Sequence, residues 1–179
     1  MESKEIIIPY KRSDSNFKLY ALGDIHAGTI HCVEEHIKIK VDEIKQQKNA
    51  FWLGMADYAE FITPKDKRFD PNLKSIAKWV EPDNIAHCQT EWLTKLFEPI
   101  KKKCLGLLYG NHENSIRVFN HDNVIKNLAR LWRDQVLGVM RRSHAGVVLL
   151  GQRIEPALNQ LHDLLQFCLG HALRAVHIE

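Results

Sequence analysis

Mostly hydrophobic positions form three short runs in the first two thirds of the chain. The runs are FKLYAL (17–22), AFWLGM (50–55) and CLGLLY (104–109). The second and third contain no charged residue, which is typical of strands that are buried on both faces of a parallel sheet. We therefore predict three buried strands, and glycine or polar residues follow each of them.

Between these runs, hydrophobic positions repeat at the spacing of an amphipathic helix. The first such stretch predicts a helix from Cys32 to Gln47. A longer helix is predicted from Asn84 to Lys103, where the terminal lysine run suits the negative end of its own helix dipole. Asp122 has the side chain expected of an N-cap for a third helix, from Asn123 to Asp134.

The alternation of strands and helices predicts an α/β fold with a parallel-rich sheet flanked by helices. At 179 residues, the chain has the length of a single domain, residues 1–179. An edge strand is predicted in EIIIPY (5–10), before the first buried run. After about Asp134 the pattern weakens, and it predicts a strand from Gly146 to Gly151 and a helix from Pro156 to Phe167.

Composition adds few constraints on function. Hydrophobic residues make up 45% of the chain and charged residues 26%, as in ordinary globular proteins. The net charge of +3 favours no nucleic-acid partner and excludes none. The sequence shows no secretory signal, and no apolar run approaches the roughly 18 residues of a membrane span. The four cysteines lack metal-type spacing, which indicates free thiols, so we expect a cytoplasmic protein without a membrane partner.

Acids, amides and imidazoles follow each of the three predicted strands. Asp24 and His26 follow the first strand, Asp57 follows the second, and Asn111 and His112 follow the third. The carboxyl ends of parallel strands meet at one edge of the sheet, where α/β proteins bind ligands. Oxygen and imidazole ligands suit divalent metals such as Mn, Fe(II) or Zn. The sequence therefore predicts a metal site at this edge.

The ordered motifs GDIH (23–26), DYAE (57–60) and GNHE (110–113) resemble those of the calcineurin-like metallophosphoesterases, which include small phage and prophage proteins. The similarity covers residues 17–131 approximately. It implies a fold like the first half of a four-layer sandwich. It also implies two divalent ions, most typically Mn, with Fe, Zn or Ni as alternatives.

The resemblance also assigns roles to residues. It implies that Asp24 and His26 hold one ion, that Asp57 bridges both, and that Asn111 holds the second. His112 would be a catalytic imidazole that steadies the phosphoryl oxygens or protonates the leaving group. The implied activity is hydrolysis of phosphomonoesters or phosphodiesters, including nucleotides or nucleic acid, by a metal-activated water. Glu113 either orients a neighbouring group or lies on a solvated face.

The second motif departs from the family pattern, because Ala56 stands where the family has glycine. The register is fixed by Asp57, which alone keeps the Asp-x-x-Glu spacing to Glu60. If the backbone of Ala56 has a positive φ angle, its methyl group costs about 1 kcal/mol or more.

The C-terminal part departs further. The family completes its site with histidines on a second sheet, and only His144 and His171 are candidates here, with Leu173 where a further histidine is expected. Two interpretations stay open: a truncated member with an incomplete second sheet, or a minimal member that completes its coordination with water or unaligned histidines.

Two classes of function remain possible from the sequence. The first is a metal-dependent phosphoesterase, and a DNA exonuclease is one possibility within this class. The alternative is an impaired or inactive family member that acts as a metal- or partner-binding domain, although no protein partner is indicated. The loop 64–68 carries Lys65, Lys67 and Arg68, which either contact a phosphate or belong to a solvated loop.

Overall fold

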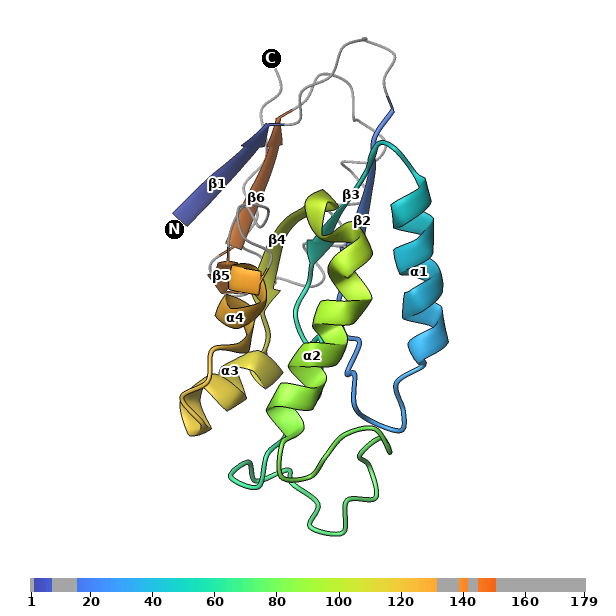
Figure 1. Cartoon of the computed structure of the whole chain (residues 1–179). Coiled ribbons are helices and arrows are strands. Elements are labelled where there is room, and N and C mark those ends of the chain that lie inside the picture. Colours follow the sequence, from blue (N-terminus) through green and yellow to red (C-terminus); the bar gives the residue numbers. More distant parts are fainter. Residues whose placement is uncertain (1, 8–15, 132–138, 142–144, 151–179) are drawn as a thin grey trace.

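The computed structural model describes residues 2–7, 16–131, 139–141 and 145–150 of the chain, and side chains within 16–131. Its main sheet consists of β2 (Lys18–Leu22), β3 (Ala50–Gly54), β4 (Cys104–Tyr109) and β5 (Val139–Arg141). These strands are parallel and lie in the order β2-β3-β4-β5 (Figure 1). The three predicted strands are confirmed, and so is the α/β class. β3 and β4 are largely buried as predicted, whereas β2 is an edge strand that is only partly buried.

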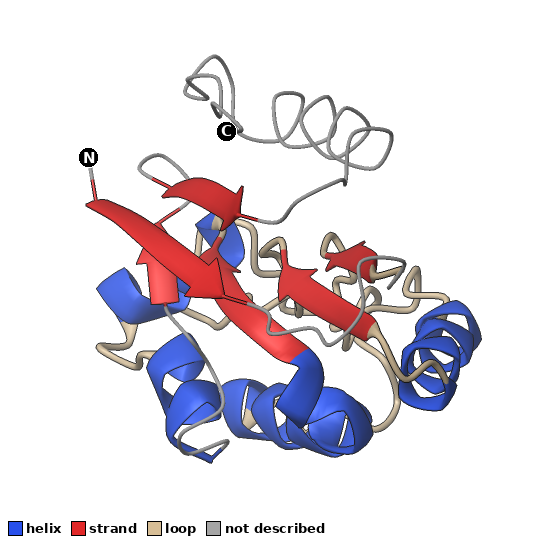
Figure 2. Ribbon diagram, turned by 90° about the horizontal axis from the view of Figure 1, so that it is seen from above, coloured by secondary structure: helices blue, strands red, loops and turns tan. Residues whose placement is uncertain are grey.

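Two further strands form a separate small sheet. β1 (Glu2–Ile7) pairs in parallel with β6 (Ala145–Leu150), so segments far apart in the sequence lie side by side (Figure 2). Strands were predicted in both regions, with bounds shifted by a few residues. The four-layer sandwich that the resemblance implies stays a prediction. The predicted helix from Pro156 to Phe167 lies outside the described residues.

The described helices occupy the predicted regions, except for one that follows β4 directly and was not predicted. They are α1 (Glu34–Gln46), α2 (Ile85–Phe97), the 3₁₀ helix η1 (Glu98–Lys103), α3 (Asn111–Phe119) and α4 (Val124–Leu131). The prediction of one α-helix from Asn84 to Lys103 was wrong, because Pro99 cannot donate a backbone hydrogen bond and the chain continues as η1. Among the described residues, no helix is long and apolar enough to cross a membrane.

The core lies between the central strands and the helices α1 and α2, which stand side by side in Figure 1. The rings of Trp52 and Phe97 stack with their centroids 4.7 Å apart. The indole Nε1 of Trp52 donates a hydrogen bond to the carbonyl of Ile100 at 2.9 Å. This bond satisfies the buried polar atom of Trp52 and holds η1 against β3.

Lys103 caps a different helix from the one predicted. Its Nζ donates hydrogen bonds to the carbonyls of Ile44, Lys45 and Gln47, at the C-terminal end of α1. Desolvation lowers the pKa of Lys103. The lysine therefore satisfies free carbonyl groups of α1 and places a positive charge at the negative end of that helix dipole.

The N-cap of α4 is also one residue away from the prediction. The backbone N–H of Lys126 donates to Oδ1 of Asn123 at 3.0 Å, which is the hydrogen bond of an N-cap. Asp122 instead accepts a hydrogen bond from the Asn127 side chain at 2.9 Å. Asn123 therefore caps the helix, and Asp122 supports it from the side.

Candidate metal centre

The loops that follow β2, β3 and β4 meet at the carboxyl edge of the sheet, as the sequence predicted. The backbone N–H groups of Ile25 and His26 donate to the carbonyl of Asp57 at 2.9 and 3.1 Å. The rings of His26 and His112 lie edge to face, with their centroids 4.7 Å apart and an angle of 82° between them. The structure therefore brings together His26, Asp57 and His112, one from each strand end.

The backbone at this edge adopts conformations that L-residues rarely use. Asp24, His26, Ala56 and Asp57 have φ angles of 50°, 49°, 80° and 51°. Aspartate tolerates this left-handed region better than alanine does, because its side chain can bond locally. Clustered backbone strain of this kind is found at functional sites, where the surrounding contacts maintain it.

Replacing Ala56 by glycine should be tolerated far better than the same change at Ala59. Both side chains are fully buried, so each change removes one buried methyl group, worth about 0.8 kcal/mol. Only Ala56 has a positive φ angle, and its relief should return about 1–2 kcal/mol. Urea unfolding should give Ala56→Gly the higher free energy of unfolding by roughly that amount. Equal losses in the two variants would show that Ala56 is not strained.

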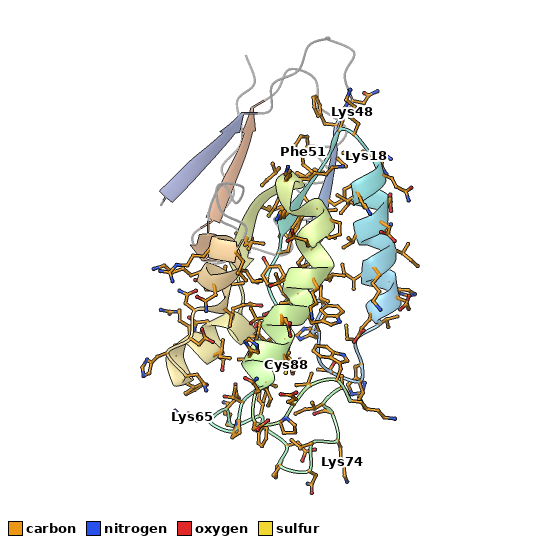
Figure 3. The ribbon with its side chains drawn as sticks, in the orientation of Figure 1. Lys18, Lys48, Phe51, Lys65, Lys74 and Cys88 are labelled. Atoms are coloured by element: carbon orange, nitrogen blue, oxygen red, sulfur yellow. The ribbon has the colours of Figure 1, made fainter. Side chains whose placement is uncertain are left out.

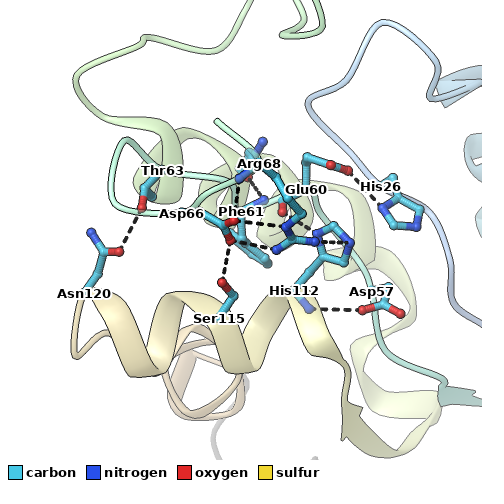
Figure 4. A network of polar contacts seen from close by, with 11 residues as sticks. His26, Asp57, Glu60, Phe61, Thr63, Asp66, Arg68, His112, Ser115 and Asn120 are labelled. Carbon is cyan, nitrogen blue, oxygen red and sulfur yellow. Dashed lines mark hydrogen bonds and ion pairs between the residues drawn. The ribbon is translucent and has the colours of Figure 1, made fainter. Parts of the chain in front are cut away.

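Glu60 contacts both histidines of the site. Its carboxylate lies 2.9 Å from Nδ1 of His26, and its backbone carbonyl lies 2.6 Å from Nδ1 of His112 (Figure 4). Both oxygens are acceptors, so Nδ1 of each ring is the donor, and Nε2 is left for other partners. Hydrogen bonds of this kind orient the histidines of metal sites. The sequence predicted no role for Glu60 at the site. Its spacing only identified Asp57 as the aspartate of the second motif.

Within the described part of the chain, His26, Glu60 and His112 form a group whose potential ligand atoms could hold one metal ion. One potential ligand atom from each lies within 4.8 Å of the others. Imidazole nitrogens and a carboxylate form a donor set suited to a divalent transition metal. This set shares only His26 with the ligands that the resemblance implied.

The remaining predicted ligands differ in their surroundings. Asp57 is 3% exposed, and its Oδ1 lies 3.3 Å from the backbone N–H of His112. Asp24 and Asn111 are exposed, and within the described part of the chain their side chains form no hydrogen bond. His144 and His171 lie outside the described residues.

Glu113 is fully buried, so the solvated alternative for this residue was wrong. Its carboxylate accepts hydrogen bonds from the backbone N–H groups of Asp57, Tyr58 and Gly110 at 3.1, 2.8 and 2.8 Å. Desolvation and the nearby Asp57 raise the pKa of Glu113 above its ordinary value. One carboxylate thus joins the loop after β3 to the end of β4.

Gly110 is required by the close approach of the Asp57 carboxylate. A Cβ atom at this position would lie 2.0 Å from Oδ1 of Asp57 and 2.8 Å from Oε2 of Glu113. Any other residue would therefore push both carboxylates out of place. The glycine of the GNHE motif allows Asp57 to lie directly against the third strand end.

Arg68 is a site residue that the motifs did not assign. Nε and Nη2 of Arg68 donate to the two oxygens of Asp66 at 3.0 and 2.7 Å, and the hydroxyl of Ser115 donates to Asp66 at 2.6 Å. The guanidinium holds the pKa of Asp66 well below its ordinary value. Nη1 of Arg68 lies 3.3 Å from Nε2 of His112 (Figure 4). Lys65, in the same loop, is exposed (Figure 3).

Comparison of the chain with protein-family models, curated proteins and solved structures finds no match. The resemblance to the metallophosphoesterases therefore rests on the three motifs.

Proposed function

We propose that this protein is a metal-dependent phosphoesterase that hydrolyses phosphomonoester or phosphodiester bonds. One observation carries the proposal. His26 and His112 lie against each other at the carboxyl edge of a parallel sheet, both held at Nδ1 by Glu60. The buried carboxylate of Asp57 adjoins them from the neighbouring strand end. This edge combines imidazole nitrogens with oxygen ligands, which is the chemistry of a divalent metal centre.

The donors present fit a divalent ion. We propose that the site binds two ions and that the metal is Mn. The motifs imply Asp24, His26 and Asp57 as ligands of the first ion. His26 is also a member of the group His26, Glu60 and His112, whose potential ligand atoms lie close together. We therefore place the firmer ion at His26 and the weaker one beside Asp57 and Asn111. When bound, such ions would supply Lewis-acid stabilisation of the phosphate and an activated water.

His112 is the residue of the chain that we propose for proton transfer. Its Nδ1 proton is bonded to the Glu60 carbonyl, so exchange with a substrate oxygen would occur at Nε2. His112 is only 6% exposed. The Glu60 carbonyl and the His26 ring both contact its imidazole, which fixes the orientation of the ring. A positioned imidazole contributes about 10²–10⁴-fold to such reactions.

Calorimetric titration with Mn²⁺, together with hydrolysis of an aryl phosphodiester, tests this function. We expect one ion to bind firmly and a second weakly. The first has three implied ligands, Asp24, His26 and Asp57, whereas the second has only Asp57 and Asn111 besides the candidates His144 and His171. Hydrolysis should rise with Mn²⁺ well beyond one equivalent. Asp57→Asn should lose most of the bound metal, whereas Asp42→Asn, an exposed change on α1, should not.

Each alternative outcome has a separate meaning. Metal binding without hydrolysis of any phosphate ester would favour the metal- or partner-binding domain. Two tight and equivalent sites would contradict the unequal arrangement, and full metal content in Asp57→Asn would contradict its bridging role. Cleavage of DNA ends in preference to small esters would select the exonuclease.

A further inference from the structure

Arg68 lies outside the three motifs, yet its side chain is held in a defined position at the site. Asp66 binds it through two hydrogen bonds, and the Asp66 side chain is only 4% exposed. The backbone N–H of Arg68 and the hydroxyl of Ser115, on α3, donate further hydrogen bonds to the same carboxylate. Because the carboxylate is buried and fixed from a second element, the guanidinium it holds has little freedom to move.

The guanidinium retains hydrogen-bonding capacity on the side of the site. Arginine has five N–H donors in a planar fork. Asp66 takes one on Nε and one on Nη2, and the contact with Nε2 of His112 takes one on Nη1. Among the described residues, the other two donors have no partner. A planar fork of this kind suits two oxygens of one phosphate.

The charges around the site explain why a cation is needed there. The hydrogen bond that Arg68 donates to Asp66 is the main cause that raises the pKa of Arg68, and the charges of Glu60 and Asp57 add to it. These carboxylates would repel a negatively charged substrate wherever the charge of a bound ion does not offset theirs. A guanidinium next to His112 offsets that repulsion where the phosphate of a substrate would contact the imidazole.

We propose that Arg68 binds the phosphate group of the substrate, with Asp66 and Ser115 as its positioning residues. The proposal rests on the proposed phosphoesterase function and names the residue that recognises the phosphate. Lys65, Lys67 and Arg68 are all exposed, so each is open to a ligand, and Arg68 is the one whose side chain is held at the site, by Asp66.

Binding of inorganic phosphate to the Mn²⁺-loaded protein, measured by calorimetry, tests the proposal without a catalytic readout. Arg68→Met should weaken phosphate binding by about tenfold or more, because charged hydrogen bonds are lost. Arg68→Lys should restore part of it, since lysine keeps the charge and loses the fork. Arg117→Met is the matched control, because Arg117 bonds only Asn114 on the exposed side of α3 among the described residues. It should bind phosphate normally.

A second arm measures KM and kcat for an aryl phosphate and the Mn²⁺ content of each variant. Arg68→Met should raise KM at unchanged metal content, and Asp66→Asn should have a smaller effect in the same direction. Unchanged phosphate binding in Arg68→Met, or loss of metal along with phosphate in both Arg68 variants, would overturn the proposal. So would a wild-type protein that binds no phosphate. Phosphate binding through Arg68 without hydrolysis would instead overturn the phosphoesterase function alone.

Discussion

His112→Ala should lower the turnover of an aryl phosphodiester by about 10²-fold or more while leaving the Mn²⁺ content nearly unchanged. Nδ1 of His112 is bonded to the Glu60 carbonyl, and Nε2 lies 3.3 Å from Nη1 of Arg68, the residue proposed to bind the phosphate. The change therefore removes a group that acts on the substrate in the transition state, and it should lower kcat more than it changes KM.

Two further variants separate the chemistry of His112 from its structural contacts. His112→Asn keeps an amide that can donate to the Glu60 carbonyl, so it should preserve stability while losing the turnover that depends on Nε2. His36→Ala removes an exposed histidine from α1 and should change neither quantity. Metal content is measured by elemental analysis after gel filtration. If His112→Ala also loses its metal, His112 is a ligand, in agreement with its place beside His26 and Glu60.

Glu113→Ala should lower the free energy of unfolding by about 3 kcal/mol or more, because three buried N–H groups would lose their acceptor. For a chain of this length, that loss corresponds to a fall in Tm of roughly 10 °C. The same change should weaken Mn²⁺ binding, since the Glu113 carboxylate joins the loop of Asp57 to Gly110. Thermal unfolding and calorimetric titration measure the two effects.

The matched control is Glu35→Ala on α1, where the carboxylate is exposed and pairs with Lys38 at 2.8 Å. Exposed ion pairs contribute about 1 kcal/mol or less, so its Tm should change little. The Tm of Glu113→Gln should lie between those of Glu113→Ala and Glu35→Ala. The amide oxygen can accept some of the three hydrogen bonds, but the amide nitrogen is a donor and cannot. Equal Tm values for Glu113→Ala and Glu35→Ala would contradict the joining role of Glu113.

The sequence predicted the strands and their common edge because both depend on local patterns. Charge-free apolar runs mark the strands β3 and β4, and parallel pairing then places the residues that follow them together. The proximity of His26 and His112 follows from these two facts. Their ring orientations do not, because they depend on which oxygen of Glu60 each Nδ1 meets.

Three residues that the sequence assigned wrongly or not at all act through long-range contacts. Lys103 caps a helix that ends more than 50 positions earlier, and Glu113 bonds a loop at a similar distance. Arg68 stands in a loop whose composition is typical of solvated segments, and only its contact with His112 places it at the site. Periodicity and capping rules describe neighbours along the chain, so they contain no information on such contacts.

The pairing of β1 with β6 has a consequence for the order in which the chain folds. Glu2 is the partner of Ala145, so almost the whole described sequence separates the two strands. The strands β2, β3 and β4 are all available by position 109, and their pairing closes shorter loops. The entropic cost of closing a loop grows with its length, and β6 is synthesised long after β1. We therefore expect β1 to remain unpaired during much of synthesis. The exposed N–H and C=O groups of an unpaired strand can pair with other chains. Slow translation between positions 109 and 145 should therefore increase aggregation of the nascent protein.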